Sequence, residues 1–252
     1  MVQYPWRSVD KDIQTKNIML GIEDESILTD SEEAEKANPN PRRVSGDRTI
    51  YSSRTLGIPK ILGRPVLADF GETRFISTLG RKWENVQPLI YRAPEVVLRM
   101  PWDHKIDIWN LGVLAWDLFE TGLLFYARDK DKNDSDRHHL AEMMAIFGPP
   151  PKDIFQSEYA TRFYNDQGNW TIPSSFDGCV PNITYATEVR QTSTNEIPTT
   201  PPDRLKANLQ GEKQALFLRF MRKMVQWRPE DRASAKELLR YDPECPSRSW
   251  ID

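Results

Sequence analysis

The chain has 252 residues, enough for one large domain or two small ones with a substantial core. Hydrophobic residues make up 38% and charged residues 28%, and the formal net charge is −3. This composition is typical of a globular protein and excludes the strong basic field that direct nucleic-acid binding favours. No apolar run approaches the roughly 20 residues of a membrane-spanning helix, so no membrane partner is expected. Only Cys179 and Cys245 occur, which predicts a reducing compartment, the cytoplasm or the nucleus.

The N-terminal part predicts a small pair of strands. The segment Asp12-Ile-Gln-Thr-Lys-Asn17 is followed by the short apolar run 18–20, which reads as a strand. A second run, residues 65–68, leads directly into Asp69. If the two runs pair, Asp12, Asn17 and Asp69 come to lie at one edge of the pair.

A long insertion, residues 22–60, separates the two predicted strands. It is first acidic and then rich in proline and arginine: Glu23, Asp24, Glu25, Asp30, Glu32, Glu33 and Glu35, then Pro39, Pro41, Arg42, Arg43 and Arg48. Such a segment buries little apolar surface, so we expect a flexible excursion on the surface.

The rest of the chain reads as mainly helical. Residues 106–120 are nearly all apolar and predict a buried helix, and residues 137–147 predict a second helix that the prolines at 149–151 stop. Helices are also expected at 213–225 and 234–240, the latter opened by the capping box Ser234-x-x-Glu237. Residues 165–210 read as an irregular excursion. The predicted fold class is therefore mainly α with a small β portion.

Four short motifs occur in a fixed order along the chain. Asp12–Asn17 is followed by Ala68-Asp69-Phe70-Gly71, then Tyr91-Arg92-Ala93-Pro94-Glu95, then Asp107-Ile108-Trp109, with Arg232 further on. Each motif is common alone, but together they resemble a eukaryotic protein kinase. The resemblance covers roughly residues 10–245. It implies a protein-kinase-like fold in which residues 1–252 are a truncated domain, the C-terminal lobe without the N-terminal lobe.

The resemblance also indicates a kinase group. Arg92 directly after Tyr91 is similar to the CMGC group. Residues 139–142, His-Leu-Ala-Glu, followed by Ile-Phe-Gly-Pro at 146–149, are similar to the SR-protein kinases. Gln14 and the insertion at 22–60 resemble the fungal members of that branch.

The family resemblance implies ATP and Mg²⁺ as cofactors and transfer of the γ-phosphate to serine or threonine of a protein substrate, with Arg/Ser-rich segments as the candidate class. It makes Asp12 the catalytic base and Asn17 and Asp69 the metal ligands, since Mg²⁺ prefers oxygen donors. Gln14 is placed beside the nucleotide phosphates. Phe70 is expected to pack into the core and Gly71 to permit the following turn.

Three further residues match structural positions of the family. Glu95 and Arg232 correspond to the partners of a buried ion pair. Asp107 corresponds to the buried acid on the central helix that holds the backbone of the catalytic loop.

The chain also departs from the kinase pattern. No Gly-rich phosphate loop and no strand lysine precede Asp12, because only eleven residues do. Asp10-Lys11 stands where kinases have His-Arg, Gln14 where a lysine reaches the phosphate, and Pro88 where a threonine bridges to the base. The short activation segment, from Asp69 to Glu95, contains Ser77 and Thr78.

These departures leave three hypotheses open. The chain is an ATP-dependent serine/threonine kinase, or a catalytically impaired kinase-like module that binds protein partners, or an incomplete product whose N-terminal lobe lies outside it. Nucleotide binding separates the first two, and upstream coding sequence tests the third.

Overall fold

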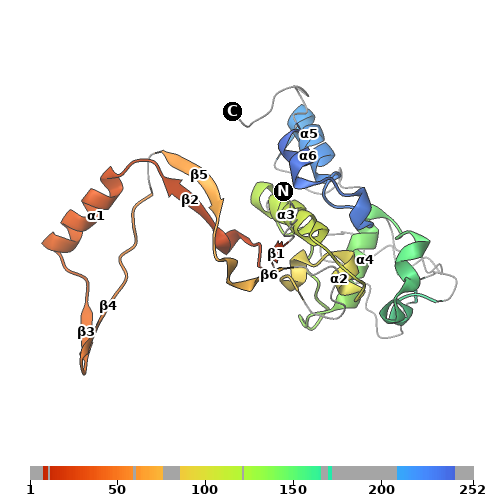
Figure 1. The fold of residues 1–252 in the computed structure, drawn as a ribbon, viewed down its shortest axis with the longest axis horizontal. Coiled ribbons are helices and arrows are strands. Elements are labelled where there is room, and N and C mark those ends of the chain that lie inside the picture. The colour runs from red at the N-terminus through yellow and green to blue at the C-terminus, as the bar shows by residue number, and fades with distance from the viewer. Residues whose placement is uncertain are drawn as a thin grey trace, which may run out of the picture. The chain divides into compact units, whose positions relative to one another are not determined.

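The computed structural model describes residues 8–10, 12–58, 61–75, 86–120, 122–165, 170–171 and 209–241. The chain divides into a first unit, Met1–Thr15 with Phe70–Asp252, and a second unit, Lys16–Asp69. Figure 1 shows the elements of both. As predicted, helix dominates, and the strands of the described ranges form three separate two-stranded sheets.

Helix α3 (Lys105–Phe119) is the helix around which the first unit packs. Ile106, Trp109 and Leu114 of this helix are completely buried. The indole of Trp109 stacks on Phe125 with the ring centroids 6.0 Å apart, and it meets Phe147 of α4 (Asp136–Phe147) edge-on at 5.8 Å. The helices predicted at 106–120 and 137–147 are therefore present to within one residue at each end.

One side of α3 faces solvent, so the prediction of a helix buried on every side is wrong. Leu111, Leu118 and Phe119 are 42%, 57% and 55% exposed. The covered side is tightly packed at Gly112, where an added Cβ would lie 3.0 Å from the Cβ of Met224. Apolar composition predicts the helix, but the number of neighbouring segments decides how much of its surface is covered.

The helix ends follow the local sequence signals. The Ser135 side chain accepts from the backbone N–H of His138 and caps α4, which ends at a left-handed Gly148 with φ +79°. Helix α6 (Ala235–Leu239) opens with the predicted capping box, in which the Ser234 and Glu237 side chains accept each other's backbone N–H. Helix α5 (Gly211–Met221) overlaps the helix expected at 213–225 but begins two residues earlier and ends four residues earlier.

In the second unit, strands β2 (Ile18–Ile22) and β5 (Leu62–Leu67) form the predicted antiparallel pair, with Ile18 opposite Leu67. The two backbones approach closely at Gly63, where an added Cβ would lie 2.5 Å from the carbonyl oxygen of Gly21. Only glycine permits this approach.

The insertion between these strands contains regular structure. It folds as helix α1 (Ser26–Ala37) and a hairpin of β3 (Arg42–Ser45) and β4 (Arg48–Tyr51). As expected, it buries little: no α1 residue is buried and every residue of β3 and β4 is exposed. Of the excursion expected at 165–210, only residues 165, 170–171 and 209–210 belong to the described ranges.

The buried ion pair expected between Glu95 and Arg232 is present. Glu95 lies on α2 (Pro94–Val97), and the side-chain exposures of Arg232 and Glu95 are 0% and 3%. The two guanidinium nitrogens Nη1 and Nη2 donate to Oε1 and Oε2 of Glu95 at 2.6 and 2.7 Å. The remaining N–H groups of Arg232 donate to the backbone carbonyls of Gln226, Lys105 and Trp227 at 3.0, 3.1 and 3.4 Å. The guanidinium therefore has a partner for each of its five donors.

We predict that Glu95→Ala lowers the free energy of unfolding by about 3–5 kcal/mol, because it leaves a buried guanidinium without its counter-charge. Replacing both partners of a buried pair by apolar residues often restores stability. Here the double variant Glu95→Leu/Arg232→Met should remain destabilised, because three backbone carbonyls, one buried and two half-buried, lose the Arg232 donors. A buried acceptor left without a donor costs about 1–3 kcal/mol. Urea unfolding measures both changes.

The exposed ion pair of Arg228 with Asp153, in which Nη2 and Oδ1 lie 2.7 Å apart, provides the control. Asp153→Asn should change the free energy of unfolding far less, because solvent screens this pair. Full recovery of stability in the double variant would contradict the role given to the three carbonyls.

Candidate active site

The loop that carries Asp12 is anchored from two sides. Strand β1 (Ser8–Asp10) leads into it and pairs antiparallel with β6 (Thr73–Phe75), so that Asp10 lies opposite Thr73. The side-chain oxygen Oδ1 of Asp10 accepts from the backbone N–H of Asp12 at 3.2 Å. From the central helix, Oδ2 of Asp107 accepts from the backbone N–H of Asp10 at 3.3 Å. Asp107 thus makes the contact with the loop backbone that the kinase resemblance implies.

Asp10 and Asp107 bring two carboxyl groups together in the interior. Asp10 is only 6% exposed. The pKa of Asp107 is raised to about 7, mainly by burial; the hydrogen bond from the Asp10 N–H lowers it, and the charges of Asp10 and Asp103 raise it. Two adjacent carboxyl groups are costly to ionise together away from water. The support of the Asp12 loop is therefore sensitive to protonation.

Gln14 contacts the proposed base. Its side-chain amide donates to Oδ1 of the half-buried Asp12, two residues earlier. Its role beside nucleotide phosphates remains a prediction. The short separation explains the contact, because a glutamine side chain reaches back over two residues to a carboxylate.

In the second unit, Asn17 and Asp69 lie at the same end of the β2–β5 pair. The backbone N–H of Ala68 donates to the carbonyl oxygen of Asn17 at 2.8 Å, which extends the ladder by one residue. Asp69 follows directly, with an exposed side chain and a left-handed φ of +63°. Asn17 is buried. The strand pairing therefore places two residues with oxygen donors suited to Mg²⁺, one amide and one carboxylate, at the same end of the pair.

The structure corrects one expectation for the residues after Asp69. Phe70 is 59% exposed, so the prediction that it packs into the core is wrong. It begins a 3₁₀ turn, Phe70–Glu72, none of whose residues is buried. Gly71 is not among the described residues with positive φ; the left-handed position is Asp69 instead. The chain therefore turns at the residue before the aromatic ring.

Gln87 is a structural residue that the sequence analysis missed. It is buried, and its φ is +72°. Its amide donates to the Ile106 carbonyl at 2.8 Å, its Oε1 accepts from the Ala93 N–H at 3.0 Å, and its backbone carbonyl accepts from the Arg92 side chain at 3.2 Å. One side chain thus joins the segment before Glu95 to helix α3. The sequence marks only the neighbouring Pro88 as unusual. Ser77 and Thr78 lie outside the described residues.

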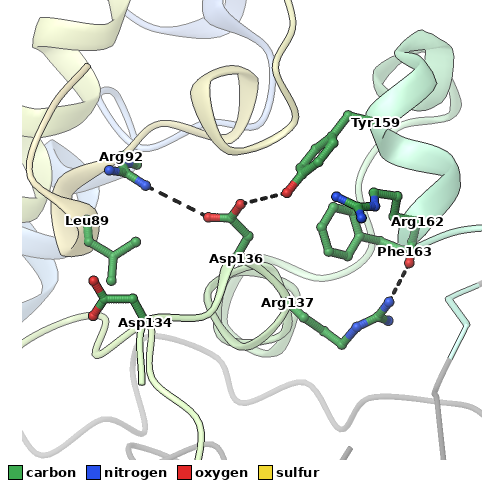
Figure 2. A pocket seen from close by; sticks show the side chains of 8 residues that line it. All are labelled: Leu89, Arg92, Asp134, Asp136, Arg137, Tyr159, Arg162 and Phe163. Atoms are coloured by element: carbon green, nitrogen blue, oxygen red, sulfur yellow. Dashed lines mark hydrogen bonds and ion pairs between the residues drawn. The ribbon is translucent and has the colours of Figure 1, made fainter. Parts of the chain in front are cut away.

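A pocket of about 600 Å³ opens beside Arg92 in the first unit (Figure 2). Asp136 links two other residues of its lining: its Oδ2 accepts from the Tyr159 hydroxyl at 3.1 Å, and its Oδ1 lies 3.9 Å from Nη1 of Arg92. Arg137 donates to the backbone carbonyl of Arg162. The pocket carries charges of both signs and is lined by Leu89, Arg92, Asp134, Asp136, Arg137, Tyr159, Arg162 and Phe163.

Comparison with known proteins identifies the family. The family model of the protein kinase domain matches residues 62–242, more than half of the chain. The chain therefore belongs to the protein kinase family. A crystallised kinase domain shares the fold at a TM-score of 0.55 and 24% identity, covering 93% of this chain and 58% of that one.

Curated relatives are serine/threonine kinases. A serine/threonine protein kinase of Aspergillus fumigatus is 40% identical over 220 residues, which are 86% of this chain and 50% of the relative. The kinase SRPK of Physarum polycephalum is 27% identical over 85% of this chain and 46% of its own length. Rat dual specificity tyrosine-phosphorylation-regulated kinase 3 is 28% identical over 69% of this chain and 28% of its length. The chain thus has CMGC members among its relatives and spans about half the length of the first two.

Two features are absent from the residues that the structure describes. No helix there is long and apolar enough to cross a membrane. No group of three or more histidine, cysteine or acidic side chains in those ranges is arranged to hold a metal ion.

The raised pKa of Asp107 predicts how stability depends on pH. Because the folded chain holds this proton up to about pH 7 and the unfolded chain releases it near pH 4, stability should fall as pH rises through this window. Glu142, whose pKa burial also raises to about 7, contributes in the same direction. Asp107→Asn should make this fall with rising pH shallower, because it removes one group that holds its proton more tightly in the folded chain. Glu142 and Asp117, whose pKa burial also raises, remain, and His139, whose pKa burial lowers to about 3, acts in the opposite direction.

Urea unfolding between pH 4.5 and 7.5 measures the slope. Asparagine keeps an oxygen that accepts from the Asp10 N–H, so the variant removes only the titration. The matched variant is Glu142→Gln, which keeps an acceptor for the backbone N–H groups of Tyr126 and Ala127, each 3.0 Å from Oε2. An Asp107→Asn slope equal to that of the parent would contradict the prediction.

Proposed function

We propose that this chain supplies the catalytic-loop part of an ATP-dependent protein serine/threonine kinase of the SR-kinase-like, fungal-type branch. The observation that carries the proposal is the position of Asn17 and Asp69 at the same end of the β2–β5 pair. Phosphoryl transfer depends mainly on positioning and charge neutralisation, for which metal-ligating oxygens are the central requirement. Membership of the kinase family supports the same reaction class.

Each proposed residue has one task. Asn17 and Asp69 hold Mg²⁺, which neutralises phosphate charge when bound. Asp12 accepts the proton of the attacking hydroxyl, and the Asp10 side chain orients its backbone. Gln14 donates to Asp12 and so keeps one carboxylate oxygen engaged while the other is available to the hydroxyl.

The proposed substrate is a protein segment rich in arginine and serine. A relative named SRPK supports this class. The pocket beside Arg92 offers the exposed carboxylate of Asp134 for a substrate arginine, and the Arg162 guanidinium for a phosphate already added. Cytoplasmic or nuclear localisation is part of the same proposal.

The alternative is a catalytically impaired module with the kinase C-terminal-lobe fold that binds protein partners. The Gln14–Asp12 hydrogen bond favours it, because a neutral amide stands where the family pattern has a cation for the transferred phosphate. In this alternative the pocket beside Arg92 binds a partner without phosphate transfer.

Nucleotide binding and phosphate transfer distinguish the two proposals. We expect the chain to bind Mg-ATP in a calorimetric titration, and Asp69→Ala to abolish this binding. Asp12→Asn should retain binding but lower transfer to an Arg/Ser-rich peptide by about 100-fold or more, because it removes only the base.

Asp131→Asn, on an exposed turn of the first unit, is the matched control and should change neither property. Absence of Mg-ATP binding in the parent chain would reject catalysis by this chain and leave the module. Equal transfer by Asp12→Asn and the parent would reject Asp12 as the base.

A further inference from the structure

The hairpin of the insertion displays a short basic sequence that ends in a serine. Strand β3 reads Arg42-Arg43-Val44-Ser45, and all four residues are exposed. The strand is extended, and its sheet contains only β3 and β4. Ser45 follows Arg43 by two residues and Arg42 by three. Such a serine, in an extended and accessible segment, suits an enzyme that recognises cationic side chains on the N-terminal side of the hydroxyl that it modifies.

The base of this hairpin is fixed to helix α1. The Glu35 carboxylate accepts from the Asn40 backbone N–H at 2.8 Å and from Arg54 at 2.8 Å. The Asn40 side chain donates to the Ser52 carbonyl at 3.0 Å. These bonds lie where the two strands begin and end. The anchored base presents the far end of the hairpin, with Ser45, to solvent.

The strand register places three of the exposed side chains on one face. Ser45 lies directly opposite Arg48, and Arg43 precedes Ser45 by two residues on the same strand. Arg42 and Val44 therefore project from the other face. The two strands are joined by Gly46 and Asp47, with Gly46 at φ +63°, as the first loop residue of a type II′ turn requires. The turn fixes the register and hence the neighbours of Ser45.

From this arrangement we infer that Ser45 is a phosphorylation site for a serine/threonine kinase that recognises basic sequences, with Arg43 and Arg48 as the partners of the added phosphate. Arg42, on the opposite face, serves recognition by the modifying enzyme. The inference is independent of whether this chain itself transfers phosphate.

The modification uses ATP bound to the modifying kinase. The Ser45 hydroxyl oxygen attacks the γ-phosphorus, the new Oγ–P bond forms, and the bond from that phosphorus to the β–γ bridging oxygen breaks. ADP leaves with the electron pair of the broken bond. The hydroxyl proton passes to a carboxylate of the modifying kinase and then to solvent.

The added phosphate changes both the charge and the pairing of the hairpin. Between residues 42 and 51, three arginines stand against one aspartate, so the hairpin carries a net charge of +2. A phosphate brings about −1.5 to −2 at neutral pH and so nearly cancels this charge. Its oxygens can accept from Arg48 across the strands and from Arg43 along the strand. An otherwise uncovered two-stranded hairpin, a marginal structure by itself, gains a cross-strand link.

The first test treats the chain with the catalytic subunit of a basophilic serine/threonine kinase and Mg-ATP. Mass spectrometry should locate one phosphate at Ser45 and none there in Ser45→Ala. The double variant Arg42→Ala/Arg43→Ala should lower the apparent kcat/KM of the modifying kinase for this chain about tenfold or more, which is the loss expected for charge-assisted contacts. Arg128→Ala, an exposed arginine of the first unit, should leave it unchanged. Phosphorylation of a peptide spanning residues 40–53 is the positive control that shows that the modifying kinase is active.

Phosphorylation of the peptide but not of Ser45 in the folded chain would overturn the assignment, as would equal rates for the double variant and the parent. The second test follows the phosphate by ³¹P NMR against pH. Pairing with Arg43 and Arg48 should lower the phosphate pKa below its value in the peptide, which is about 6. Arg48→Ala should raise it towards that value. Identical phosphate titrations in the chain, the variant and the peptide would contradict the proposed pairing with Arg43 and Arg48.

Discussion

The guanidinium of Arg232 is the interaction on which the first unit depends. It meets both carboxylate oxygens of Glu95 and three backbone carbonyls, one of them from Lys105 at the start of α3. A buried charge is tolerated only when it is paired and hydrogen-bonded, and this one is fully so. The same contacts join α2, the beginning of α3 and the segment after α5. Distant parts of the sequence are thereby fixed around one side chain.

The order imposed by Arg232 extends to the proposed catalytic base through α3. Two residues after Lys105, Asp107 holds the backbone of Asp10, and Asp10 in turn holds that of Asp12. Each link is a hydrogen bond to a backbone group, so the loop conformation does not depend on long side chains. The Asp10 carboxylate, however, adds a second negative group to a buried place. The support of the loop is accordingly built from groups whose protonation matters, and its strength depends on pH near neutrality.

Features carried by a few adjacent residues were predictable from the sequence. The capping box at Ser234 and the strands that flank the insertion are present. The ion pair of Glu95 with Arg232, which joins distant parts of the chain, is present as the family resemblance implied. Features that depend on which segments cover a residue were not predictable from the sequence. Phe70 is exposed although its motif suggested burial, and the apolar sequence of α3 does not show which side remains in solvent. The role of Gln87 arises from a left-handed backbone and from hydrogen bonds to Ala93 and to the more distant Ile106, which leave no local signal.

The insertion follows a different physical rule from the first unit. Its helix and hairpin bury almost nothing, and the contacts that hold them together are the polar bonds of Glu35, Asn40 and Arg54. Such bonds contribute little net stability where water competes for both partners. A change of charge on the hairpin is therefore large relative to what holds the insertion together, whereas the same change would be small against the buried network of Arg232. Chemistry that adds or removes charge acts most strongly on the part of the chain that is least constrained by packing, and the hydroxyl of Ser45 lies in that part.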